Sequence, residues 1–415
     1  MKKKNNATNK LEKEIKVLLR EKIDRLNKDT FKQTEVVFLL IITSIISVFV
    51  GYSIKKTGNI TQEDKHLNEI VDNYNYIIDN YYDDIDKDKL VSGAIDGMIN
   101  SLDDEFSSLL KQDSSSSFYI NLKGTYEGIG IEIYNNENND IVVYGIIKDS
   151  PAAKANLKPG DIIKKIDEQT LENTNISVLT KYVQENKKAT YELLIVRDGK
   201  EENITIERSL ITIKSVLSKT FEKNGKKIGY IYISVFAEAT SKQFEEELNK
   251  LEKEKIDALI IDVRNNSGGQ LTTAVSVISN FLNSKKVIYQ IEKDGKKTKY
   301  YSSGKVTKKY PIAIIQNGES ASASELLSSS LKESYGATVI GNKSYGKGTV
   351  QEIIGLKNGD TYKFTTKKWL TPNGNFINKV GITPDIEVDL SDDYSKNPTD
   401  DTDNQLQTAI DYLAK

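Results

Sequence analysis

The chain has 415 residues, 38% of them hydrophobic, and a formal net charge of -2 at neutral pH. This length allows two or three domains with sizeable cores, and the nearly balanced charge predicts no nucleic-acid partner. The sequence contains no cysteine and one histidine, His66. A cysteine nucleophile is therefore excluded, and a histidine-activated serine would have to recruit His66, which we expect on a solvated helix face.

The N-terminal residues predict a membrane anchor. Residues 1–35 carry eleven lysines and arginines, and residues 36–54 form an uncharged apolar run of 19 residues. As a helix, this run is about 28 Å long, close to the hydrocarbon thickness of a bilayer. The positive charge before it predicts a cytoplasmic N-terminus and an extracytoplasmic remainder. The run is longer than the core of a signal peptide, so we expect an uncleaved single-pass anchor rather than a signal peptide or a buried helix.

Helical segments are predicted on both sides of this run. Residues 11–26 fit either an amphipathic helix on the inner leaflet or a solvated coil. Residues 67–82 and 89–102 predict two helices of an N-terminal region that we bound at residues 60–115. The tyrosines of this region suit a subunit interface as well as a core.

Residues 116–207 resemble a PDZ domain. The resemblance rests on a segment interrupted by glycines at 124–133, a predicted strand at 141–147 and a predicted short helix at 152–155. In such a domain, loop amides bind the terminal carboxylate of a peptide that adds as a strand, which points here to Gly128, Ile129, Gly130 and Ile131. The helix expected at 176–183 forms the other wall, with Val178 and Tyr182 lining the pocket. The glycines alone would also fit a tight turn.

Residues 208–390 predict a mixed α/β core. Strands are expected at 228–235, 258–263 and 312–315, separated by helices at 240–251 and 271–282. Strands alternating with helices of this length indicate parallel pairing. Residues 391–415 supply a polar linker, 391–401, and a terminal helix, 405–413.

A run of small residues, Asn317–Glu325, joins a predicted strand to a predicted helix. This places Ser322 at a strand-to-helix turn, where backbone N–H groups are free. The amide of Ala323 is a natural half of an oxyanion hole. The second predicted donor is Gly268, in a glycine pair that follows the strand at 258–263 and lets the backbone approach a reacting carbonyl.

The predicted base is Lys347, 25 positions after Ser322. A free lysine titrates at about 10.4, so burial must lower its pKa for it to act near pH 7. Lys347 lies on a glycine-rich turn between short strands predicted at 337–341 and 349–354, from which its side chain can point inward. Gln351 is expected on the strand face beside it, where a hydrogen bond would position the amine.

These motifs together resemble the carboxy-terminal processing peptidases, tail-specific Ser/Lys proteases with an embedded PDZ domain. The resemblance rests on residues 262–269, the Ser-Ala-Ser-Ala-Ser-Glu run, residues 345–348 with Gln351, and residues 381–385, and it extends from about residue 67 to the C-terminus. It implies a core of ClpP/crotonase-like type and the site Ser322, Lys347, Gln351, Ala323 and Gly268. It also implies pairing of subunits through the N-terminal helices. Ser267 and Trp369 depart from the usual proline and tyrosine.

Two other patterns are treated as chance. Residues 341–347 fit the start of a phosphate-binding P-loop, but Gly348 replaces the hydroxyl residue that binds magnesium, and a strand is expected next. Ser344 with Lys347, and Ser329 with Lys332, form Ser-x-x-Lys pairs. The Lys-Thr-Gly sequence that should accompany such a pair occurs at 56–58, beside the apolar run.

The resulting expectation is a membrane-anchored, extracytoplasmic serine endopeptidase that binds the free C-terminal tails of protein substrates and cleaves through an acyl-enzyme. It needs no metal or cofactor. A regulatory PDZ ligand and a homodimer remain open as partners. The competing class is a catalytically inactive PDZ adaptor at the membrane, which the combination of Ser322, Lys347 and Gln351 disfavours.

Overall fold

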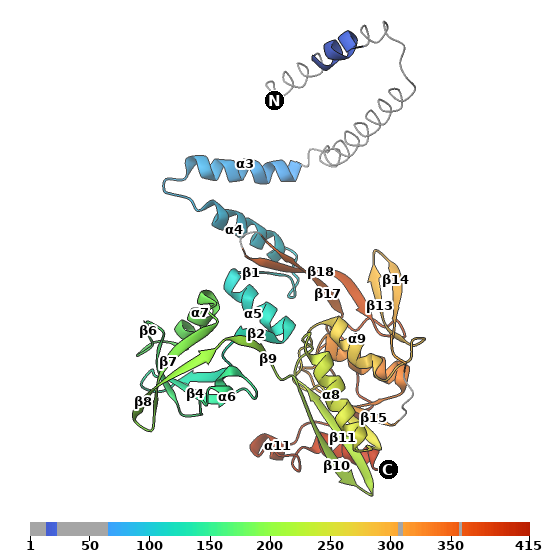
Figure 1. Ribbon diagram of the computed structural model, residues 1–415. Helices are drawn as coiled ribbons and strands as arrows, with labels where there is room; N and C mark the ends of the chain where they lie inside the picture. Colours follow the sequence, from blue (N-terminus) through green and yellow to red (C-terminus); the bar gives the residue numbers. More distant parts are fainter. Residues whose placement is uncertain (1–13, 23–64, 306–309, 357–358) are drawn as a thin grey trace, which may run out of the picture. The chain divides into compact units, whose positions relative to one another are not determined.

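The computed structural model describes residues 14–22, 65–305, 310–356 and 359–415 (Figure 1). They belong to two compact units, Met1–Leu90 and Val91–Lys415. The expected anchor at residues 36–54 lies outside the described residues. Within the described residues, no helix has both the length and the apolar character needed to cross a membrane.

The first unit is helical where it is described. Residues 14–22 form an exposed helical segment, and α3 spans Lys65–Asn80. His66 lies exposed on α3, as expected, and apolar α3 side chains such as Leu67 and Ile70 are also exposed. The next helix, α4 (Lys87–Asn100), crosses the boundary between the units. Both predicted helices of this region are confirmed within a few residues.

A small antiparallel domain occupies the region that resembles PDZ domains. Its sheet has the order β3-β4-β5-β7-β8, with β6 beside β5. Ile141, Ile163 and Leu193 are among the side chains of its separate buried core. The elements are β3 (Ile131–Asn135), β4 (Ile141–Ile146), α6 (Pro151–Lys154), β5 (Ile162–Ile166), β6 (Gln169–Thr170), α7 (Ile176–Asn186), β7 (Thr190–Arg197) and β8 (Lys200–Glu207). The two-stranded ribbon of β2 (Thr125–Gly128) and β9 (Ser209–Thr212) brackets the domain in the sequence.

The main sheet of the second unit follows the sequence order β10-β11-β12-β15-β16-β19. The β10–β11 pair is antiparallel, and the pairs from β11 to β19 are parallel, which confirms the mixed α/β core. The strands are β10 (Val216–Lys223), β11 (Lys226–Ile233), β12 (Ala258–Asp262), β15 (Ile312–Gln316), β16 (Thr338–Gly341) and β19 (Ile386–Glu387). Because parallel strands end at one edge, the loops after β12, β15 and β16 meet there.

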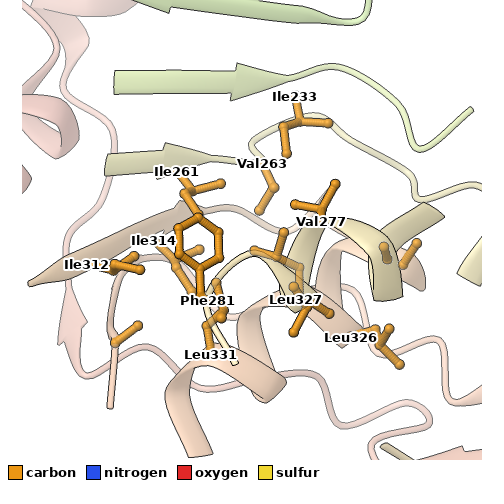
Figure 2. Packing of buried hydrophobic residues seen from close by; sticks show 14 of the residues in the cluster. Ile233, Ile261, Val263, Val277, Phe281, Ile312, Ile314, Leu326, Leu327 and Leu331 are labelled. Atoms are coloured by element: carbon orange, nitrogen blue, oxygen red, sulfur yellow. The ribbon is translucent and has the colours of Figure 1, made fainter. Parts of the chain in front are cut away.

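One face of this sheet packs against three helices, α8 (Thr240–Lys253), α9 (Leu271–Ser279) and α10 (Ala323–Ser330). Alternate strand residues point into this layer, where Ile261 and Ile314 meet Phe281 and Leu327 (Figure 2). These side chains are buried, and burial of each contributes about 2 kcal/mol. The chain continues from α10 into a π-helical turn, Leu331–Tyr335.

The opposite face is covered by the terminal helix α12 (Asn404–Leu413), which buries Leu406 and Ile410 against strand residues. An ion-pair network ties this helix to the end of β12. The guanidinium of Arg264 bonds Asp262 and also Asp403, whose carboxylate accepts the N–H of Leu406 at the start of α12. The predicted linker before it contains a short helix, α11 (Asp392–Lys396).

A second sheet, absent from the sequence-based expectations except for one strand, has the order β1-β18-β13-β14, with β17 also paired to β18. Its strands are β1 (Ser108–Leu110), β13 (Val287–Lys293), β14 (Lys296–Tyr301), β17 (Thr349–Gly355) and β18 (Thr361–Leu370). Figure 1 shows the long strand β18 beside β17. Strand β1 comes from the region assigned to the N-terminal helices, so the second sheet includes residues that precede the PDZ-like domain in the sequence.

The helix α5 (Gln112–Lys123) connects β1 to the PDZ domain. It ends at Gly124, whose φ of 68° suits glycine. The carbonyl of Leu122 accepts hydrogen bonds from the side chain of Gln270 and the backbone of Glu238. The C-terminal end of α5 is therefore fixed to the α/β core.

Candidate active site

Ser322 lies between the end of β15 and the start of α10, which confirms the expected strand-to-helix turn. Its φ is 54° and its ψ is -111°, a conformation that costs free energy for a residue with a side chain. Its backbone N–H donates to the carboxylate of Glu325, 2.7 Å away. This bond holds the strained turn, and the N–H of Ala323 follows at the first position of the helix.

The glycine loop after β12 lies against this turn. A Cβ on Gly268 would come within 2.8 Å of both the Ala321 carbonyl oxygen and the Ser322 Cβ, and the φ of 107° also requires glycine. The Gly268 N–H donates to the Asn266 side chain at 2.9 Å. A donor role for Gly268 therefore requires that this bond be shared or exchanged when a carbonyl oxygen arrives.

Glu325 is a site residue that the sequence analysis did not identify. Its side chain is fully buried and accepts from the N–H groups of Ser322, Gly346 and Lys347 and from the Ser344 hydroxyl, at 2.6 to 2.8 Å. Burial raises the pKa of Glu325, and these four hydrogen bonds oppose that rise. The carboxylate thus links the turn of the serine to the turn of the lysine.

Lys347 lies on the turn between β16 and β17, as expected. Burial, and then the positive charge of Lys363, lowers the pKa of Lys347 to about 8, against the opposing effects of Asp104, Glu105 and Glu325. At that value about a tenth of the amine is neutral at pH 7. The Nζ lies 4.3 Å from the centre of the Phe106 ring. The predicted lowering of the lysine pKa by burial is confirmed.

A cavity of about 550 Å³ is lined by three of the five expected site residues, and Ala323 and Gly268 are not among its lining residues. Ser322, Lys347 and Gln351 all line it. The amide nitrogen of Gln351 donates to the hydroxyls of Thr349 and Thr365, at 3.0 and 3.1 Å. These bonds fix the Gln351 side chain at the cavity wall, and the predicted hydrogen bond from Gln351 to the amine stays a prediction. The remaining lining is mostly apolar and includes Phe118, Leu122, Leu271, Val350 and Ile353.

A second cavity, of about 470 Å³, lies at the PDZ domain and is lined by Gly128, Ile129, Gly130 and Ile131, the predicted loop. The cavity is also lined by residues of α7 and its C-cap, but not by the expected Val178 and Tyr182. The lining residues here are Leu179, Thr180, Val183, Gln184 and Lys187. The two expected side chains pack against the PDZ core instead, and the Tyr182 hydroxyl donates to Asp167. The helix itself was predicted correctly, but the face that it turns toward the cavity was not.

One side chain of this second cavity was not anticipated. Arg208, which follows β8, lines the cavity, and its Nη2 lies 2.5 Å from the carboxylate of Glu127. A guanidinium next to loop amides is suited to an anionic group. The helix α5 lines both cavities, through Ser116 and Ile120 at the PDZ domain and through Phe118 and Leu122 at Ser322.

The structure also bears on the two patterns treated as chance. In the stretch that resembles a P-loop, the N–H groups of Gly346 and Lys347 donate to the Glu325 carboxylate, so they are not free to cradle a phosphate. The Ser344 hydroxyl is likewise bonded to Glu325. Across the described residues, no cluster of three or more histidine, aspartate or glutamate side chains is arranged to hold a metal ion.

A strained serine at a helix N-terminus, which shares a cavity with a half-buried lysine of lowered pKa, defines a serine-type hydrolase, and the attached PDZ domain indicates peptide substrates. Comparison with known families agrees. Residues 227–388 match Peptidase family S41, residues 128–207 match the PDZ domain family, and residues 50–114 match the family described as Activating protease CtpB N-terminal domain.

Curated relatives give the same assignment. The chain is 36% identical over 341 residues to the carboxy-terminal processing protease CtpB of Bacillus subtilis, covering 81% of this chain and 71% of that protein. It is 33% identical over 387 residues to CtpA of the same organism, covering 91% and 82%. A probable CtpA-like serine protease of Staphylococcus aureus is 34% identical over 356 residues, covering 84% and 71%. The chain belongs to the carboxy-terminal processing peptidases of family S41 and is a serine-type endopeptidase.

Proposed function

We propose that the protein is a membrane-anchored, extracytoplasmic endopeptidase that binds the C-terminal tails of proteins through its PDZ domain and cleaves them with Ser322 and Lys347. The observation that carries the proposal is the shared cavity of Ser322 and Lys347, with the pKa of the lysine lowered to about 8. A base with a pKa near the working pH is the kind that general-base catalysis favours.

In the proposed reaction, the Ser322 hydroxyl attacks the scissile carbonyl carbon while the neutral amine of Lys347 accepts its proton. The carbonyl oxygen becomes an oxyanion that the Ala323 N–H, and the Gly268 N–H once it is available, would stabilise. The tetrahedral intermediate collapses to an acyl-enzyme, and the leaving amine takes the proton from Lys347. Water then attacks the ester with Lys347 again as base, which returns Ser322 to its free form.

Recognition of the tail is proposed for the PDZ cavity. The amides of residues 128–131 and the guanidinium of Arg208 offer donors for a carboxylate, while Ile129, Leu179 and Val183 offer an apolar wall. A free C-terminus with a small or apolar last residue matches both features. Arg208 already pairs with Glu127, so a bound carboxylate would compete with that side chain.

The location and assembly belong to the same proposal. The basic residues 1–35 and the apolar run 36–54 support an anchor with the later residues outside the cell. The exposed apolar face of α3, which includes Leu67, Ile70 and Val71, supports pairing of two copies. Parallel strands covered by helices support a ClpP/crotonase-like classification of the core.

The test is covalent labelling of the full-length protein with a fluorophosphonate, followed by peptide mapping. We expect one modified residue, Ser322, and loss of labelling in Ser322→Ala. A folded wild-type protein that is neither labelled nor able to cleave any tail peptide would instead support the inactive PDZ adaptor.

A further inference from the structure

A short turn that precedes the PDZ domain in the sequence contacts Lys347, the proposed catalytic base. Residues 104–107 lie in the connection between α4 and β1, and the ring of Phe106 lies under the Lys347 ammonium, 4.3 Å from Nζ to the ring centre. More than 200 residues separate Phe106 from Lys347 in the sequence. None of the catalytic motifs includes this turn.

Hydrogen bonds fix the turn in place. The Ser107 hydroxyl donates to the Asp104 carboxylate at 2.5 Å and accepts the backbone N–H of Thr365 at 3.1 Å. The Thr365 hydroxyl in turn accepts from Gln351, which lines the catalytic cavity. Strand β1 then pairs with β18 from Ser108 to Leu110. The turn that carries the ring is therefore held by β18, the strand that also bonds Gln351 and the Lys347 carbonyl.

The turn acts on the lysine in two opposing ways. The ring face attracts a cation and loses that attraction when the amine is neutral. The same ring covers the amine, and exclusion of water disfavours the charged form. The charged groups that act on Lys347 are Lys363 from β18, Glu325 from α10, and Asp104 and Glu105 from the turn itself.

We propose that Phe106 is a positioning residue for Lys347: its ring binds the ammonium form, shields the amine from water, and leaves the neutral amine free to turn to Ser322. This rests on the proposed role of Lys347 as the base. The active site is then completed by a segment outside the region 227–388 that matches the peptidase family. In the sequence, the turn follows α4 and precedes the PDZ domain.

The experiment compares three variants of the full-length protein by the pH dependence of fluorophosphonate labelling. Phe106→Leu keeps an apolar cover but removes the ring, so the midpoint of the profile should fall by about half a pH unit. Phe106→Ala also opens the amine to water, so its midpoint should rise above that of Phe106→Leu. Phe106→Tyr keeps the ring and should retain the wild-type midpoint.

Phe221→Leu is the matched control, because Phe221 contacts Lys219 in the same way on β10 and lines neither cavity. Its midpoint should not move. Thermal unfolding identifies any variant that fails to fold. If Phe106→Ala does not fold, the difference between the midpoints of Phe106→Leu and Phe106→Tyr decides the test. Equal midpoints for folded Phe106→Leu and Phe106→Tyr would overturn the proposal. Absence of Ser322 labelling in the wild type would instead overturn the proposed function.

Discussion

The activity of this protease should depend on pH in a way that Lys363 controls. Lys363 lines the catalytic cavity from β18, and its positive charge is the largest influence after burial that lowers the pKa of Lys347. At a pKa of about 8, roughly a tenth of Lys347 is neutral at pH 7, whereas an ordinary lysine at 10.5 would be about 0.03% neutral. The neutral, base-competent fraction of Lys347 at pH 7 is therefore roughly 300 times that of an ordinary lysine.

The sign of the pH dependence follows from the active form. Because the neutral amine is the base, the labelling rate should rise about tenfold per pH unit below 8 and level off above it. Replacing Lys363 by methionine removes a like charge from the cavity wall. Such a charge is worth about 1 kcal/mol, so the midpoint should move up by somewhat less than one pH unit.

The measurement is the second-order rate of fluorophosphonate labelling from pH 6 to 10, with Ser322→Ala as the blank. Lys367→Met is the matched control, since Lys367 lies on the same strand but pairs with Glu352. A wild-type rate that is flat from pH 6 to 9, or a Lys363→Met midpoint equal to that of the wild type, would refute the assignment of Lys347 as a base tuned by its surroundings.

Three further outcomes are expected. Ser322→Ala and Lys347→Ala should abolish peptide cleavage without unfolding the protein while His66→Ala keeps full activity; loss of activity in a folded His66 variant would contradict the dyad. Glu325→Gln should slow labelling by about 100-fold and lower the melting temperature, because an amide cannot accept all four bonds of the buried carboxylate; unchanged labelling would show that the link between the two turns is dispensable. Amidated tails should be cleaved more slowly than free-acid tails, and deletion of residues 123–208 should remove the difference; equal rates for both tails in the full-length protein would count against tail binding by the PDZ domain.

The elements that could be predicted are those whose side chains repeat with a clear period or whose turns need particular residues. The buried strands at Ala258–Asp262 and Ile312–Gln316 are continuous apolar runs, and the turns at Ser322 and Lys347 are marked by small residues and glycines. These signals were enough to place Ser322 at a strand-to-helix turn and Lys347 on a turn between two strands. The structure agrees with that placement.

The parts that could not be predicted depend on tertiary contacts between distant segments. Phe106 is one aromatic residue in a polar loop, and nothing local indicates that it meets Lys347. Glu325 follows the serine motif and looks like an ordinary first-turn carboxylate of a helix. The prediction chose the wrong α7 side chains for the PDZ cavity. The period of a helix identifies its buried face, but it does not show which edge of that face lines the cavity.

Trp369 gives this protein a built-in optical probe. It is the one tryptophan of the chain, its side chain is fully buried, and its indole N–H donates to the carbonyl of Lys347 at 2.8 Å. Indole emission changes in wavelength and intensity with the polarity and hydrogen bonding around the ring. Intrinsic fluorescence excited at the tryptophan band therefore reports on the lysine turn alone, so binding of a tail peptide or acylation of Ser322 can be followed in real time without attaching a dye.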